Sequence, residues 1–202
     1  MLKLADLLQQ FGFLEKWNFI HVVLTDGRDE KSQSTLGNVL KAVRDINQKL
    51  STNVFKMAII GVGVTPQTEN ELKTIAEMGE ESVEYYNAAD EGIEHIFQRI
   101  TVGLGMQERQ EVVGVINNQF VAVQRRMEPT LQLQIHNFAV LLNLEVSESM
   151  RGSKWNEVCT SVEKVHGFLG NNDIIAAMVF NEQAKLLCKV EPNDPLFQPS
   201  AA

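Results

Sequence analysis

Short apolar runs alternate with amphipathic stretches along most of this chain. Each apolar run is short, and most end at Gly, Pro, Asn or Asp, which is typical of strands that are buried on both faces of a parallel sheet. The strands predicted in this way cover residues 18–25, 54–62, 83–87, 137–146 and 173–180. Residues 184–190 follow a turn and are predicted to pair back as an antiparallel edge strand.

The stretches between the apolar runs have the spacing of amphipathic helices. Leu4, Leu7, Leu8 and Phe11 recur at helical intervals and predict a helix over residues 2–14. Further helices are predicted over residues 34–50, 68–78, 90–100 and 153–169. Thr68 and Glu71 have the spacing of a capping box, and Ser153 is the predicted N-cap of the last helix.

Strands that alternate with helices of this length predict an α/β fold with a doubly wound, mostly parallel sheet and right-handed crossovers. Residues 1–101 and 136–190 each hold part of this alternation. Residues 102–135 are rich in Gln, Glu, Arg and Val and are predicted to be a partly helical linker, with a strand over residues 119–125 as an alternative. Residues 191–202 have no periodicity and are predicted to be a disordered tail.

Composition narrows the classes of partner. The net charge is −8 and there is no basic stripe, so neither nucleic acid nor an anionic membrane surface is expected to bind. No apolar run is long enough to span a bilayer, and the first residues lack the features of a signal peptide, which together predict a cytoplasmic protein. Cys159 and Cys188 fit no paired motif and are predicted to be reduced and buried.

One stretch of the second half resembles a known family. The apolar run from Phe138 to Val146 contains Glu145 near its end and is followed by Ser147, Ser149 and a Met-Arg-Gly turn. This resembles the first strand, metal loop and first helix of von Willebrand factor A domains, whose loop has the pattern Asp-x-Ser-x-Ser. Residues 172–181 resemble the second strand of that family.

The other half of the family pattern comes earlier in the chain. Val22 to Asp29 resembles the fourth strand with its Thr-Asp-Gly ending, and Ile59 to Gly63 resembles the fifth. Leu72 to Ala76 and Tyr86 to Ala88 resemble the next helix and the sixth strand. The resemblance covers most of the chain, but the C-terminal half of the pattern precedes the N-terminal half.

Two interpretations of the reversed order are open. The chain is either a circular permutant that folds as one domain, or a piece of a tandem array that holds the end of one domain and the start of the next. A half-sheet would expose an apolar strand edge, which favours the permutant. The family's sheet order then predicts the strand order 184–190, 173–180, 137–146, 18–25, 54–62, 83–87.

The resemblance implies a metal site at the ends of strands 18–25 and 137–146. Ser147 and Ser149 would be direct hydroxyl ligands, and Glu145 and Asp26 the nearby acids, of Mg²⁺ or alternatively Mn²⁺ or Ca²⁺. The sequence departs from the family pattern at two points. Glu145 replaces an aspartate, and the loop that supplies a threonine ligand in the family would precede Met1.

The function that these features predict is a protein-binding module and not an enzyme. The resemblance implies that a carboxylate of another protein completes the coordination of the metal. One alternative is a Rossmann-like, Mg²⁺-dependent enzyme that handles phosphates, for which the sequence offers no evident nucleophile or general base. Another is an incomplete fragment, in which exchange of half-domains between copies would cause self-association.

Overall fold

The strands of both halves of the chain join in a single sheet. In a computed structural model, which describes residues 17–27, 36–50, 55–103, 137–147, 150–170, 173–181 and 184–190, the sheet has six strands in the order β3-β2-β1-β4-β5-β6. The strands are β1 (Trp17–Thr25), β2 (Phe55–Gly61), β3 (Val83–Asn87), β4 (Asn137–Glu145), β5 (Ile174–Phe180) and β6 (Ala184–Val190).

The order of the strands agrees with the prediction from the sequence. The strands from β3 through β5 are all parallel to their neighbours, which confirms the doubly wound α/β class. β6 pairs antiparallel with β5, with a shift of register between Ala177 and Met178. Within the sheet, the pairing of β1 with β4 joins residues before 101 to residues after 136.

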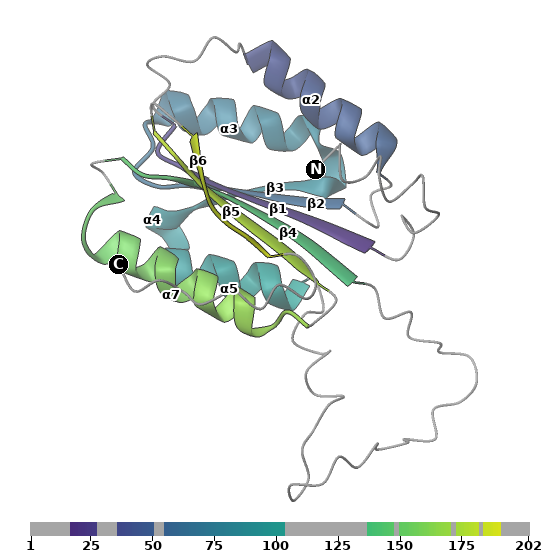
Figure 1. The fold of residues 1–202 in the computed structure, drawn as a ribbon. Coiled ribbons are helices and arrows are strands. Elements are labelled where there is room, and N and C mark those ends of the chain that lie inside the picture. The colour runs from purple at the N-terminus through teal and green to yellow at the C-terminus, as the bar shows by residue number, and fades with distance from the viewer. Residues whose placement is uncertain are drawn as a thin grey trace, which may run out of the picture.

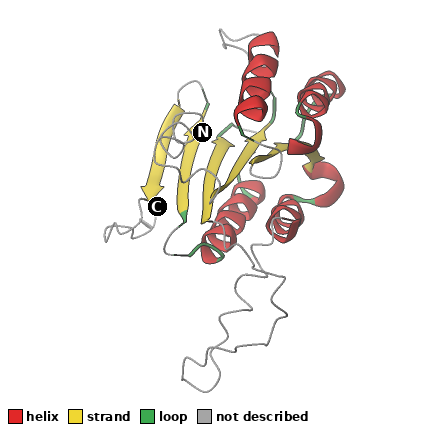
Figure 2. Ribbon diagram, turned by 90° about the vertical axis from the view of Figure 1, so that its right-hand side faces the viewer, coloured by secondary structure: helices red, strands yellow, loops and turns green. Residues whose placement is uncertain are grey.

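Helices cover both faces of the sheet. They are α2 (Leu36–Lys49), α3 (Pro66–Met78), α4 (Ala88–Glu91), α5 (Ile93–Gly103) and α7 (Ser153–Gly167), with a 3-10 turn at Glu80–Ser82 before β3. In Figure 1, α2 and α3 lie on one side of the sheet, and α4, α5 and α7 lie on the other. Figure 2 shows the same layers from a second direction, with the strands fanned into a twisted sheet.

The strand β1 shows why its apolar run is nearly continuous. Ile20, Val22 and Leu24 point into the core that α5 and α7 cover, whereas Phe19 belongs to the core on the opposite face. Since both faces of the central strands are covered, apolar side chains are required at almost every position. Apart from Asn18 and His21, the polar residues lie at the end of the strand, where the candidate site begins.

Two of the predicted helix caps are wrong. The N-cap of α3 is Thr65, whose side chain accepts a hydrogen bond from the Thr68 N–H at 3.2 Å, with Pro66 as the first helical residue. Thr68 therefore lies inside the helix, because proline's fixed φ favours that first position. α7 begins at Ser153, and its N-cap is Gly152, which makes no side-chain capping bond.

The predicted burial of Cys159 is also wrong. Cys159 is a free cysteine that is exposed on α7, whose buried residues are Val158, Ser161 and Val165. One residue of helix rotates a side chain by about 100°, so Cys159 turns away from the core when Val158 faces it. The side chain of Cys188 lies outside the described part of the structure.

Some predictions fall on residues that the structure does not describe. These are the helix over residues 2–14, nearly all of the linker, the tail over residues 191–202 and the candidate ligand Ser149. α5 extends to Gly103, slightly beyond the predicted start of the linker. Among the described residues, no helix is both long and apolar enough to cross a membrane.

Candidate functional site

The candidate site lies where β1 and β4 end side by side. The two strands are parallel and in register from Trp17 and Asn137 to Leu24 and Leu144. Chain connections leave these two ends in opposite directions, since β1 leads through α2 to β2 and β4 leads through α7 to β5. Ligands of open α/β sheets bind at such a switch point, beyond the carboxyl ends of the strands.

Hydrogen bonds tie the end of β1 to the side chain of Glu145. The Thr25 hydroxyl donates to Glu145 Oε2 at 2.5 Å, and the Asp26 backbone N–H donates to the same oxygen at 2.9 Å. The Gly27 N–H in turn donates to Thr25 Oγ1 at 2.9 Å. Gly27 has a φ of 70°, which glycine adopts without strain and which turns the chain at this point.

Two acids are buried together in this network. Asp26 is only 2% exposed and Glu145 only 7%. Burial raises the pKa of Glu145, and the Asp26 carboxyl raises it further, while the bonds from the Thr25 hydroxyl and the Asp26 N–H oppose the shift. Two adjacent buried carboxylates repel each other, so the pair favours either a retained proton or a bound cation.

Ser147 follows β4 at the same edge of the sheet and is half-buried. Its backbone carbonyl accepts a hydrogen bond from the Met150 N–H at 3.0 Å, and the Val146 N–H donates to the Phe180 carbonyl at 2.8 Å. The first bond closes a local turn, and the second anchors the segment after β4 to β5. Of the four predicted site residues, the structure brings Asp26 and Glu145 into direct interaction. Ser147 lies two residues after Glu145, and Ser149 is outside the described residues.

Two contributors to this edge are not among the predicted ligands. Thr25 donates a hydrogen bond of 2.5 Å to Glu145, and its only signal in the sequence is its place in the Thr-Asp-Gly ending. Thr68 of α3 lies against Gly27, because a Cβ built on Gly27 would lie 2.0 Å from Thr68 Cγ2. No local pattern indicates that Thr68 contacts this loop, since the two residues meet only in the folded chain.

The donor chemistry of these residues fits a hard divalent cation. Carboxylate and hydroxyl oxygens are the ligands that Mg²⁺ and Ca²⁺ prefer, and Asp26, Glu145 and Ser147 supply both types. Within the described ranges there is no group of three or more His, Cys, Asp or Glu side chains that could hold a metal. A cation here would therefore depend on hydroxyl groups and water as well as on the two acids.

Two cavities of the molecule lie away from this edge. One has a volume of about 520 Å³ and lies between α5 and the strands β1, β2 and β3. The other, of about 160 Å³, lies between α5 and α7. Asp26, Glu145 and Ser147 line neither cavity. Val146, by contrast, is 39% exposed, so an apolar side chain faces solvent directly beside the buried acids.

Fold and site together define a doubly wound α/β domain with an acidic pair at its switch point. No family model matches the chain, and no curated protein matches it. It is similar to a crystal structure described as an uncharacterized protein from Alicyclobacillus acidocaldarius, with a TM-score of 0.52 and 21% sequence identity.

That similarity covers 86% of this chain and 79% of the other. Neither half of this chain alone amounts to 86% of its 202 residues, so the similar region includes both halves. At this level of identity the likeness concerns the fold alone. It agrees with the single sheet that β1 and β4 join.

Proposed function

We propose that this chain is a protein-binding module of the von Willebrand factor A type, which binds its partner at the β1–β4 strand ends. The observation that carries the proposal is the buried interaction between Asp26 and Glu145 at the switch point. Burying two acids side by side is costly for folding. A fold that buries two acids at this cost makes them candidates for a function that uses them.

A divalent cation would make use of this arrangement. Asp26 and Glu145 would hold it through carboxylate oxygens and Ser147 through its hydroxyl, with Mg²⁺ or Mn²⁺ as the fitting ions. When bound, the cation would supply a positive charge to which a carboxylate of the partner binds. The Thr25 hydroxyl and the Asp26 N–H would keep Glu145 in position, as they do by hydrogen bonds at 2.5 and 2.9 Å.

The surface around the acids favours a protein over a small substrate. Val146 is 39% exposed at the end of β4, and Leu36 and Val39, at the start of α2, are 39% and 37% exposed. α2 is the helix that follows β1 in the chain, and Figure 1 shows it above the sheet on the same face as α3. Neither of the two cavities described above lies at Asp26 and Ser147, so neither offers the enzyme alternative a substrate site there.

The cation can be tested by nuclear magnetic resonance with Mn²⁺, whose unpaired electrons broaden nearby amide signals. We expect the amides of Asp26, Gly27, Val146 and Ser147 to broaden first, and an excess of Mg²⁺ to reverse the effect. Asp26→Asn should abolish this selective broadening. Glu94→Gln is the control, because Glu94 is an exposed acid on α5 that pairs with Lys164. Uniform weak broadening, unchanged in Asp26→Asn, would refute the cation site.

Partner binding can be tested by placing a photo-crosslinking amino acid at Val146. The matched control is Met78, which is 38% exposed at the end of α3 and therefore at the opposite edge of the sheet. We expect a partner protein to be crosslinked at Val146 only in the presence of Mg²⁺, and not in Asp26→Asn. Equal crosslinking at Val146 and Met78, or crosslinking that is insensitive to both Mg²⁺ and Asp26→Asn, would contradict the proposal.

A further inference from the structure

The strand β3 forms one edge of the sheet. It pairs with β2 in a regular parallel register from Val83 to Asn87, and no described strand lies on its other side. Such an edge presents unpaired backbone N–H and C=O groups, to which a further strand can bind. Natural edge strands often carry a proline or a bulge that prevents this pairing, and β3 has neither. The edge is therefore a candidate surface for an extended segment.

The neighbouring ladder shows which backbone groups of β3 point outward. The Val62 N–H, directly after β2, donates to the Thr25 carbonyl of β1 at 2.9 Å. Because the backbone groups of successive strand residues point to opposite sides, the odd-numbered residues of β2 bond to β3. Ile59 lies opposite Tyr85, and in a parallel ladder it bonds to the two neighbours of Tyr85. The N–H and C=O of Tyr85 itself therefore point away from β2, towards the open edge.

Val83 and Asn87 are the other outward residues of β3. The Val83 N–H donates to the Glu80 carbonyl, and the carbonyl of Asn87, the N-cap residue of α4, accepts the first bond of that helix. Among the described residues, the outward groups left to a partner are the Val83 C=O, the Tyr85 N–H and C=O, and the Asn87 N–H. Donors and acceptors at this spacing match the backbone of a second strand.

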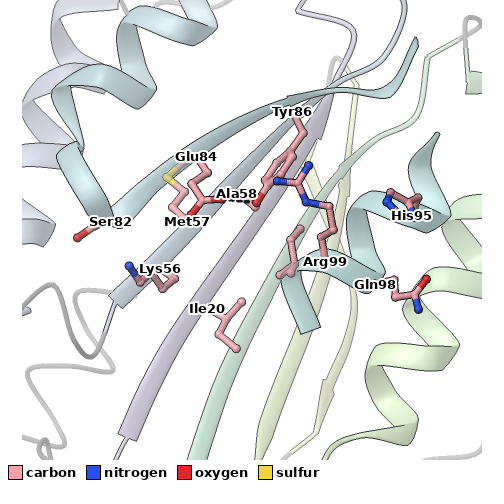
Figure 3. Close-up of a pocket in the computed structure, with 11 residues that line it drawn as sticks. Ile20, Lys56, Met57, Ala58, Ser82, Glu84, Tyr86, His95, Gln98 and Arg99 are labelled. Carbon is pink, nitrogen blue, oxygen red and sulfur yellow. Dashed lines mark hydrogen bonds between the residues drawn. The ribbon is translucent and has the colours of Figure 1, made fainter. Parts of the chain in front are cut away.

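The larger cavity is an open groove that lies beside β3 on the face that α5 covers. Its volume is about 520 Å³, and Glu84 and Tyr86 of β3 form part of its wall, as Figure 3 shows. Residues that lie directly opposite each other in neighbouring strands direct their side chains to the same face. A strand added to β3 would therefore direct the two residues opposite Glu84 and Tyr86 towards this groove. The residue opposite Tyr85 would point to the other face.

The groove favours uncharged side chains. The Tyr86 hydroxyl donates to the Glu84 carboxylate, and the Arg99 guanidinium lies 5.0 Å from the centre of the Tyr86 ring. Arg99 pairs with Glu91 at 2.6 Å, which leaves Lys56 and Glu84 as charges of opposite sign that balance each other in the groove. A charged side chain that entered would have no counter-charge. The inner lining is apolar and buried, and consists of Ile20, Ala58 and Ile100.

We propose that β3 binds an extended segment of another protein by strand addition, and that this segment carries uncharged, apolar side chains at two alternate positions. Its backbone would pair with the outward groups of Val83, Tyr85 and Asn87. Its apolar side chains would lie at the groove beside Glu84 and Tyr86. In this mode of recognition the backbone bonds supply the affinity and the groove selects the side chains. The surface is separated from the β1–β4 strand ends by β2 and does not depend on a metal.

A blocked peptide of sequence Gln-Val-Thr-Val-Gln is a suitable probe, because its two valines point to one face when it is extended. The controls are the peptides in which both valines are replaced by lysine or by glutamate. In titrations followed by nuclear magnetic resonance we expect the amide signals of Tyr85 and Asn87 to shift and saturate, and both controls to bind at least about fivefold more weakly. Equal binding of all three peptides would overturn the selection of apolar side chains.

Hydrogen exchange and N-methylation separate backbone pairing from apolar contact alone. A near-saturating concentration of the valine peptide should slow exchange of the Tyr85 and Asn87 amides about fivefold or more, without a comparable change at Glu84 and Tyr86, which already bond to β2. N-methylation of the peptide, either at the threonine or at both valines, blocks backbone bonds on one side of it. One of these two peptides should bind about fivefold more weakly, which also gives the direction of the added strand. Binding that neither methylation weakens would refute strand addition.

A charge variant locates the peptide side chains. Glu84→Gln leaves the groove with a net positive charge, so it should strengthen binding of the glutamate peptide about fivefold and leave the valine peptide nearly unchanged. Glu94→Gln is the control, because Glu94 is an exposed acid on α5 that does not line the groove and pairs with Lys164. If Glu84→Gln changed binding of the glutamate peptide no more than Glu94→Gln does, the peptide side chains would not lie at the groove, and the assignment would be wrong.

Two further comparisons exclude other occupants and separate this proposal from the previous one. Protection of the Tyr85 amide that rises with protein concentration in the absence of peptide would identify a second copy of the chain as the occupant, and would overturn the proposal. Asp26→Asn should leave peptide binding unchanged, and Glu84→Gln should leave the Mn²⁺ effect at the strand ends unchanged. Failure of one test therefore leaves the other proposal intact.

Discussion

The unsatisfied hydroxyl of Ser82 makes a prediction about stability that is independent of any ligand. In the structure it is 1% exposed and has no partner among the described residues. Leaving a buried polar group unpaired costs about 1–3 kcal/mol relative to its hydration in the unfolded chain. Ser82→Ala removes the hydroxyl and keeps the Cβ, so the variant should be more stable than the wild type.

The expected gain follows from two opposing contributions. Removal of the unpaired hydroxyl contributes about 1–3 kcal/mol, whereas the few atomic contacts that it makes are worth about 0.1–0.2 kcal/mol each. The oxygen has almost no accessible surface, so its removal leaves a void of about one atom, which offsets part of the gain. We therefore expect the free energy of unfolding to rise by about 1 kcal/mol, and Tm by about 2–4 °C for a chain of this size.

Ser161 provides a matched control. It is also 1% exposed, but its hydroxyl donates to the Glu157 carbonyl at 2.7 Å. Ser161→Ala loses this bond, worth about 1 kcal/mol, and regains about half of it from the higher helix propensity of alanine. Urea denaturation followed by circular dichroism measures both variants. A loss of stability in Ser82→Ala as large as that in Ser161→Ala would show that the Ser82 hydroxyl has a partner after all.

Three further predictions concern the two central strands. Burial and Asp26 raise the pKa of Glu145. The free energy of unfolding should therefore rise as pH falls from the raised pKa towards the ordinary value, and Glu145→Gln should remove this rise. An identical pH dependence in the variant and the wild type would contradict this. Burial lowers the pKa of His21 from 6.5 to about 4. The neutral imidazole therefore contributes about 3 kcal/mol to the free energy of unfolding, which is complete above pH 6.5 and is lost as pH falls to about 4. His21→Gln should flatten that decrease in denaturation curves recorded over this pH range, and an unchanged slope would contradict it. Gly27→Ala should destabilise the fold by about 2 kcal/mol, because φ is 70° and the new Cβ would lie 2.0 Å from Thr68 Cγ2. Adding Thr68→Ser to this variant should recover only the steric part of the loss. Full recovery in urea denaturation would argue against backbone strain.

The strands could be predicted from the sequence because burial on both faces leaves a strong local signal. The apolar runs over residues 18–25 and 137–146 match β1 and β4 to within one residue at each end. The alternation with helices was sufficient to predict the parallel class. The order of the strands was predicted from the resemblance of the two halves to a family whose first and fourth strands are neighbours, and it agrees with the structure.

Side-chain burial on the helices was less predictable. Leu36 and Val39 have the spacing of an inward face, yet they are 39% and 37% exposed, whereas Val43 on the same helix is buried. Helical periodicity specifies which residues share a face. It does not specify how far along the helix a neighbouring element covers that face. The start of α2 extends beyond the apolar core, and Leu40 is the first residue of the helix that packs against that core.

At the candidate site, the sequence by itself determined which polar residues end the two central strands. Asp26 and Glu145 could be identified as acids at strand ends from local pattern alone. Only the tertiary structure decided that they interact, that the Thr25 hydroxyl and the Asp26 N–H donate to Glu145, and that the pKa of Glu145 is raised. These properties depend on distance and burial between residues about 120 positions apart in the chain, and such distances exist only after β1 and β4 have paired.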